Sequence, residues 1–212
     1  MRTTTGQPIR LSDYRPPDYL IDDVRLDISL DRTTTRVVAT LALRPNPAGR
    51  VNVALDLEGD ELRFVSVALD GAPLEPSAFE ASPDKLTLPN PPRRPFTLRI
   101  ETELDPSANT KLMGLYRSGS AYCTQCEAEG FRRISYFLDR PDVLSTYVTR
   151  LEADRGEAPV LLANGNCVET GAAPDGRHYA IWRDPHKKPC YLFALVAGDL
   201  AHIADHFTTR SG

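Results

Sequence analysis

Apolar and polar residues alternate through the first half of the chain. The first two runs place apolar side chains at Val24, Leu26, Ile28 and Leu30, and then at Ala39, Leu41 and Leu43. Side chains two positions apart in a strand face the same side, so each run predicts a strand with one buried and one wet face. The polar stretch DRTTT at 31–35 predicts the hairpin connection between the two strands.

The same period of two returns three times before residue 105. The apolar positions are Val51, Val53, Leu55 and Leu57, then Val65, Val67 and Leu69, and finally Phe96, Leu98, Ile100 and Leu104. The middle run ends in the turn dipeptide Asp70-Gly71. Short strands separated by Pro, Gly and Asp, with no amphipathic helix pattern between them, predict an all-β fold, an antiparallel β-sandwich with long loops.

The second half is less regular but keeps a β pattern. Strands are predicted in the stretches 147–153, 159–163, 178–184 and 191–199, with a turn at Asn164-Gly165. The run at 191–199 is apolar on both faces, which is typical of a central strand. HIADHFTTRSG at 202–212 resembles one more strand that stops without a partner, so we expect the natural chain to continue.

These patterns divide the chain into three parts. Residues 1–18 are polar and proline-rich, with Pro16-Pro17 closing the segment, and they predict an arm lying over the domain. Residues 19–199 form the predicted β-rich domain, and 200–212 form a connection to whatever follows.

The charge balance argues against a nucleic-acid partner. The net charge is −4, the pI is about 5.6, and the basic residues are scattered rather than gathered into a stripe. No apolar signal segment and no run of about 18 apolar residues occurs, so neither secretion nor a membrane span is predicted. We therefore expect a soluble, cytoplasmic protein with reduced thiols.

Cysteine and histidine spacings suggest metal sites only superficially. Cys123 and Cys126 form one C-x-x-C, but structural zinc needs four ligands, and Cys167 and Cys190 each stand alone. Small buried thiols are the better interpretation. The spacing of His202 and His206 matches H-E-x-x-H, yet the position of the essential Glu is occupied by Ile, so no metal site is predicted there either.

Gln125 and Glu127 are the remaining candidates for binding. In an extended loop, residues two apart point the same way, so these two side chains would form one acceptor-rich spot suited to an ammonium group. The alternative is a solvated acidic turn, or a carboxylate paired with Arg132 or Arg133. Spacing alone favours this alternative.

The string CTQCEAEGFRRISYFLDRPDVL at 123–144 resembles the amine-recognition loop of the bacterial aminopeptidase N family, which are zinc metallopeptidases of the gluzincin type. Four further stretches resemble the same family in the same order: DYRPPDY at 13–19, NGN at 164–166, KPCYLFALVAGDL at 188–200 and FTTRSG at 207–212. The resemblance spans nearly the whole chain and is weakest through 31–95.

The resemblance implies a saddle-like antiparallel β domain that leans over a thermolysin-like catalytic domain and carries no zinc itself. It implies that Gln125 and Glu127 hold the free α-amino group of a peptide substrate, with no transferred role for Glu129, and that the cysteines are structural. The chain contains neither G-x-M-x-N nor H-E-x-x-H. One zinc ion and the catalytic residues are therefore expected in a catalytic domain beyond residue 212, and this segment alone is expected to be inactive.

The partners implied are the catalytic and C-terminal domains of the same polypeptide and peptides with a free N-terminus, in a parent enzyme that is monomeric. The alternative function is a free-standing β-sandwich module that ends naturally near Gly212 and uses its acidic loop to bind another cation.

Overall fold

The computed structural model describes residues 10–212, and fifteen strands make up about half of this part of the chain. Its helical segments are four single 3₁₀ turns: η1 (Leu11–Asp13), η2 (Pro76–Ala78), η3 (Phe131–Arg133) and η4 (Cys190–Leu192). Among the described residues, no helix has the length and hydropathy that a bilayer crossing requires. The all-β prediction is confirmed.

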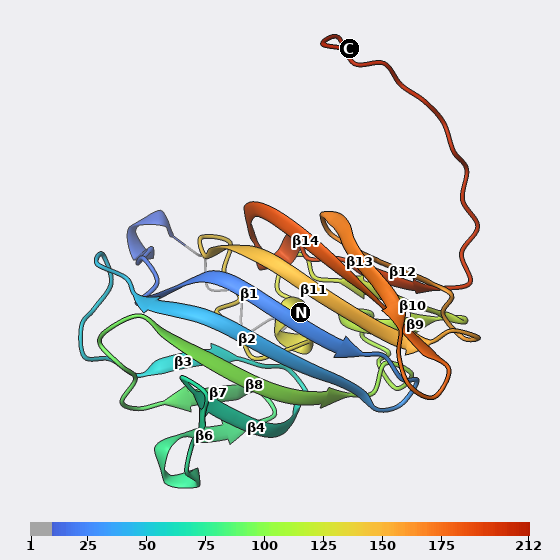
Figure 1. Cartoon of the computed structure of the whole chain (residues 1–212). Helices are drawn as coiled ribbons and strands as arrows, with labels where there is room; N and C mark the ends of the chain where they lie inside the picture. Colours follow the sequence, from blue (N-terminus) through green and yellow to red (C-terminus); the bar gives the residue numbers. More distant parts are fainter. Residues whose placement is uncertain (1–9) are drawn as a thin grey trace.

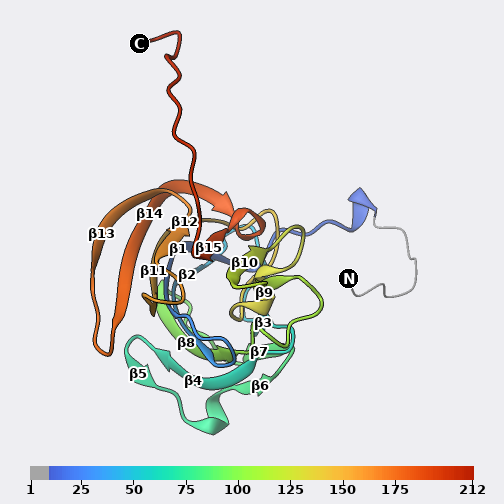
Figure 2. The ribbon, with the colours of Figure 1, turned by 90° about the vertical axis from the view of Figure 1, so that its right-hand side faces the viewer.

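The largest element is an eight-stranded sheet with the order β13-β14-β11-β1-β2-β8-β4-β5. Its strands are β1 (Tyr19–Ser29), β2 (Thr35–Pro45), β4 (Arg63–Leu69), β5 (Ala72–Pro73), β8 (Phe96–Leu104), β11 (Leu144–Asp154), β13 (Asn166–Ala172) and β14 (Arg177–Pro189). Figure 2 shows this sheet as an arc that curves around the rest of the domain.

Two smaller sheets lie inside the arc (Figure 2). One has the order β12-β15-β10-β9 and the other has the order β3-β7-β6. The strands are β3 (Leu55–Glu58), β6 (Glu80–Ser82), β7 (Lys85–Leu88), β9 (Gly114–Ser118), β10 (Ala121–Gln125), β12 (Val160–Ala163) and β15 (Leu195–Gly198). The small sheets cover the inner face of the large one, and the core lies between them.

The period of two places one face of each long strand in this core. Val24 and Ile28 of β1 and Ala39 and Leu41 of β2 are completely buried. The polar residues between them lie on the outer face. The predicted hairpin is confirmed, since β1 pairs antiparallel with β2.

One pairing departs from the antiparallel prediction. β1 and β11 are parallel neighbours, with Val24 opposite Tyr147 and Ile28 opposite Leu151. Apolar alternation reports which face of a strand is buried but not the direction of the neighbouring strand, so the sequence could not reveal this pair.

The predicted strand at 51–57 is shorter in the structure. It begins only at Leu55, and Val51 is 81% exposed. The run at 191–199 begins with the η4 turn and becomes β15, which is central in its sheet as predicted.

The prediction of a strand at 202–212 is wrong. Residues 200–209 have no secondary structure, and residues 201–212 are exposed and lead away from the domain (Figures 1 and 2). β15, from which they continue, already has β12 and β10 on its two sides, so the chain leaves the sheet rather than extending it.

The predicted arm at 1–18 lies partly outside the described residues, because the description begins at residue 10. Its last residues are tied to the domain by hydrogen bonds. The Tyr14 hydroxyl donates to Asp142 at 3.1 Å, Arg140 donates to the Arg15 carbonyl at 2.8 Å, and Asn46 donates to the Pro17 carbonyl at 2.6 Å.

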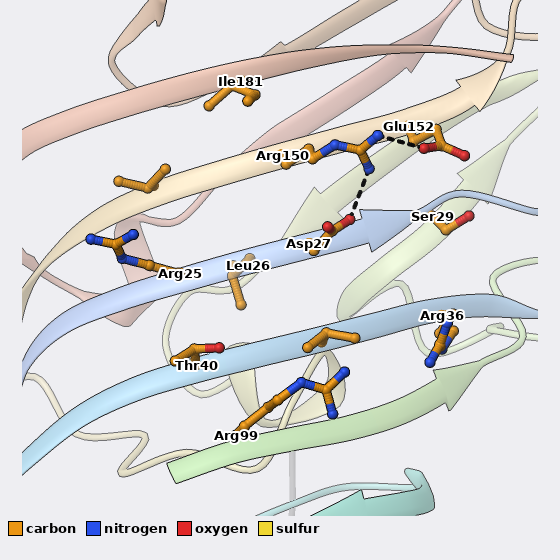
Figure 3. Close-up of a pocket in the computed structure, with 12 residues that line it drawn as sticks. Arg25, Leu26, Asp27, Ser29, Arg36, Thr40, Arg99, Arg150, Glu152 and Ile181 are labelled. Atoms are coloured by element: carbon orange, nitrogen blue, oxygen red, sulfur yellow. Dashed lines mark hydrogen bonds and ion pairs between the residues drawn. The ribbon is translucent and has the colours of Figure 1, made fainter. Parts of the chain in front are cut away.

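The outer face of the large sheet carries a hollow of about 600 Å³ (Figure 3). Arginines from neighbouring strands line it, and carboxylates on the same face pair with them. Arg150 contacts Asp27 at 3.0 Å and Glu152 at 2.6 Å (Figure 3). Arg36 contacts Glu101 at 2.6 Å, and its guanidinium holds the pKa of this carboxyl below the usual range.

We expect the stability of the chain to fall in acid through this pairing. A carboxyl whose pKa is lower in the folded chain contributes stability that is complete above its unfolded pKa, about 4.3, and is lost as the pH falls through the folded value. In urea unfolding at pH 6, the free energy of unfolding should be lower for Glu101→Gln than for wild type. This gap between the two proteins should narrow towards pH 2. A gap that does not change with pH would contradict the assignment.

The turn between β12 and β13 depends on Gly165. Its φ is +89°, and a methyl group there would overlap the backbone carbonyl of Arg183. Gly176, with φ +76°, has nothing within 4 Å of the same position. We therefore expect Gly176→Ala to cost about 1 kcal/mol from backbone strain alone and Gly165→Ala to cost roughly 3 kcal/mol, as measured by urea unfolding. Equal losses for the two variants would contradict this account.

Candidate functional site

Gln125 lies at the end of a strand rather than within a loop. It is the last residue of β10 and pairs with Gly114 at the start of β9. The β9–β10 hairpin was not predicted, because only a few of its apolar side chains alternate clearly. Its position is set by β15, whose Ala197 lies opposite Tyr122.

The chain turns sharply after β10, and we call residues 125–130 the amine loop, a name that reflects only the expectation from the sequence resemblance. Gln125, Glu127 and Glu129 are exposed, whereas Cys126 is only 2% exposed. The peptide bond between Glu127 and Ala128 is cis. The loop thus presents three polar side chains to solvent and inserts one thiol into the core.

A hydrogen bond within the loop orients the Gln125 amide. Its Nε2 donates to the Glu127 backbone carbonyl at 3.1 Å. With the NH₂ group engaged in this way, the amide oxygen is the end that remains for another group. Gln125 and Glu127 together offer an amide oxygen and a carboxylate, and both accept hydrogen bonds from a cation.

The arginines near the loop pair with other carboxylates. Within the described range 10–212, no basic side chain lies within ion-pair distance of Glu127, whereas Arg132 contacts Glu129 at 3.5 Å. Arg133 is buried and contacts Asp60 at 2.9 Å and Glu61 at 2.8 Å. The alternative to amine binding expected from the sequence included a carboxylate paired with Arg132 or Arg133. In this loop, Glu129 forms such a pair and Glu127 does not.

Sequence reasoning missed the groups below the loop. The Asp139 side chain is 1% exposed and accepts hydrogen bonds from Arg132 at 2.8 Å and from the Cys190 thiol at 3.0 Å. A carboxylate inside the apolar run ISYFLD was the only available signal, since a buried charge needs partners.

The four cysteines are unpaired and differ in burial. Cys126 and Cys190 are buried and Cys123 is half-buried, as small structural thiols would be. Cys167 is exposed, so the buried-thiol interpretation is wrong for that residue. Residues 10–212 contain no group of three or more His, Cys, Asp or Glu that could hold a metal ion, and His202 and His206 lie exposed in the C-terminal segment.

The hollow of Figure 3 is a weaker candidate than the amine loop. Most of its arginines already meet carboxylates on the same face, so their charges are compensated within the sheet. The carboxylate of Glu127 has no such partner among the residues described above.

Comparison with known proteins identifies the family of the chain. The model of the peptidase M1 N-terminal domain matches residues 15–192. The chain is 52% identical over its whole length to an aminopeptidase N of Caulobacter vibrioides, covering 24% of that protein, and 50% identical over 94% of its length to an aminopeptidase N of Escherichia coli, covering 22% of it. It thus spans about a quarter of the length of the curated relatives that it matches.

Solved structures show the same likeness. Aminopeptidase A of Legionella pneumophila, in complex with aspartic acid, superposes with a TM-score of 0.91 at 37% identity, over 96% of this chain and 24% of that one. An M1 zinc metallopeptidase of Deinococcus radiodurans shares the fold, with a TM-score of 0.74 at 16% identity over 87% of this chain and 43% of that one. On the match across residues 15–192 and the identity to these relatives, the chain belongs to the peptidase M1 N-terminal domain family.

Proposed function

We propose that this chain is the substrate-amine-binding domain of a longer zinc aminopeptidase, which removes the first residue from peptides. The family membership and the coverage of about a quarter of each relative support this proposal. In the complete polypeptide, residues 1–18 form an arm, residues 19–199 form the binding domain, and residues 200–212 lead towards the catalytic domain.

The observation that carries the proposal is the orientation of the acceptors on the amine loop. The Gln125 amide donates to the Glu127 backbone carbonyl, which leaves its own oxygen free to accept a hydrogen bond. The Glu127 carboxylate, in the same loop, is exposed and forms no ion pair among residues 10–212. A substrate ammonium has three N–H donors and a positive charge, so it matches an amide oxygen and a carboxylate. The Legionella structure contains aspartic acid, a ligand with a free α-amino group.

This binding accounts for removal of a single residue. Holding the α-ammonium at a fixed carboxylate places the first peptide bond at a fixed distance from the site. A substrate extended or blocked at its amino end lacks the charge at that position and is rejected. Gln125 and Glu127 therefore bind and orient the substrate, and they take no part in bond breaking.

Residues 10–212 contain no group of three or more His, Cys, Asp or Glu side chains that could hold a metal ion. We place the single zinc ion in the catalytic domain of the longer polypeptide. Zinc in such an enzyme polarises the scissile carbonyl and activates water.

Four unpaired cysteines suit a reducing compartment, which supports a cytoplasmic location for the protein. We further propose a monomeric parent enzyme.

The first test is Glu127→Ala in the complete polypeptide. We expect kcat/KM on aminoacyl anilides to fall by roughly 10²- to 10³-fold, about 3 to 4 kcal/mol, because one partner of a charge contact that the catalytic domain would enclose is removed. Glu129→Ala is the matched control, since it removes an exposed carboxylate from the same loop and should change kcat/KM by less than about threefold. Unchanged kinetics for Glu127→Ala would refute the assignment and favour a module that binds another cation.

The second test is Gln125→Ala in the same enzyme. We expect a loss of about tenfold in kcat/KM, which is smaller than for Glu127→Ala because a neutral acceptor is removed rather than a charge. A loss larger than that of Glu127→Ala, measured on the same anilides, would mean that the amide and not the carboxylate is the main anchor.

A further inference from the structure

The amine loop is exposed at its tip and closed at its base. The Gly130 N–H donates to the Cys126 carbonyl at 2.8 Å. A methyl group at Gly130 would lie 2.5 Å from the Gln125 carbonyl oxygen and 2.8 Å from the Cys126 Cα. The two ends of the loop are therefore in contact, and whatever fixes Gly130 also fixes Gln125.

Directly after Gly130, the chain is anchored in the core by an aromatic side chain. Phe131 is completely buried, and its ring lies 4.7 Å from that of Phe137 and 5.3 Å from that of Phe193, measured between centroids. Aromatic packing holds Phe131 in the core, but it is non-directional. It therefore does not by itself fix the orientation of the backbone next to Phe131.

Asp139 supplies the directional contacts. Its Oδ2 accepts from the Arg132 backbone N–H at 3.2 Å and from Arg132 Nε at 2.8 Å, while its Oδ1 accepts from the Cys190 thiol at 3.0 Å. The Asp139 backbone carbonyl accepts from Arg132 Nη2 at 3.3 Å, and its N–H donates to Glu58 at 2.9 Å. One buried carboxylate thus joins η3, at the end of the amine loop, to η4, which precedes β15.

The thiol is a donor in this arrangement. Burial, together with the charge of Asp139, raises the pKa of Cys190 far above neutral pH, and burial does the same for Cys126. Both thiols therefore stay protonated, and Cys190 keeps its S–H directed at the carboxylate. β15, which follows η4, also pairs with β10, the strand that ends at Gln125. The hydrogen bond from Cys190 to Asp139 therefore links both ends of the amine loop to the same carboxylate.

We propose that Asp139 is a positioning residue for amine binding: by holding Arg132 and Cys190, it sets the direction in which Gln125 and Glu127 present their acceptors. This inference rests on the proposed function of those two side chains. Asp139 itself does not touch the substrate.

The test compares two inhibitors of the complete enzyme, L-leucine and 4-methylpentanoic acid, which differ only in the amino group. The inhibition constant of 4-methylpentanoic acid divided by that of L-leucine, called the inhibitor ratio below, measures recognition of the ammonium. We expect Asp139→Asn to reduce this ratio at least tenfold, with the constant for 4-methylpentanoic acid and the zinc content unchanged within about twofold. A residue with a merely structural role would weaken both inhibitors together, and that result would overturn the proposal.

A second pair of variants decides the outcome if Asp139→Asn does not fold. Cys190→Ala removes one donor to the Asp139 carboxylate and should reduce the ratio about threefold. Cys190→Ser keeps a hydroxyl donor and should leave the ratio at the wild-type value. The control is Glu101→Gln, which neutralises a buried carboxylate on the outer face of the large sheet and should leave the ratio unchanged. An unchanged ratio in Cys190→Ala would also overturn the proposal.

Glu127→Ala separates this inference from the proposed function. If that variant leaves the inhibitor ratio unchanged, the amine-binding role of the loop itself fails. If Glu127→Ala brings the inhibitor ratio to about one while Asp139→Asn and Cys190→Ala leave it at the wild-type value, the loop binds the amine and only the positioning role of Asp139 fails.

Discussion

The apolar inner face of the eight-stranded sheet has to be covered, and most of the architecture follows from that requirement. Leu41 and Leu98, on adjacent strands of this face, are completely buried. A single sheet cannot bury them by itself, so two small sheets pack against it. The curvature of the large sheet gives both of them room (Figure 2). The β9–β10 hairpin, which ends at the amine loop, is part of this cover and takes its rigidity from the core.

A polar group inside such a core has to be satisfied by hydrogen bonds. Burying the Asp139 carboxylate without partners would cost several kcal/mol, and its contacts to Arg132 and Cys190 offset that cost. Those contacts work only in one geometry, because an acceptor and its donors must stay within hydrogen-bond distance. Apolar packing holds the core together without fixing the orientation of individual groups. The hydrogen bonds of the buried Asp139 carboxylate fix the orientation of the backbone at Arg132, where the chain enters the core from the amine loop.

The sequence predicted those features that depend on a regular local pattern. β1, β2 and β8 were foreseen because period-two alternation persists through each of them. The parallel neighbour of β1 was not, since Ile28 and Leu151 meet across more than a hundred residues and alternation carries no direction. Gln125 and Glu127 were candidates from their residue types and spacing, but spacing alone favoured a solvated turn, and it was the resemblance that favoured amine binding. The contact between Asp139 and Cys190 joins residues 51 positions apart, which no motif signals.

The position of β15 in its sheet has a consequence for biosynthesis. It is the last strand of residues 10–212, yet it lies between β12 and β10 rather than at an edge. While the ribosome is still making this part of the protein, β10 therefore lacks one of its two neighbours, and the surface next to Tyr122 stays uncovered until residue 198 has emerged. The corner of the domain that carries residues 125–130 therefore cannot be complete before β15 has been made.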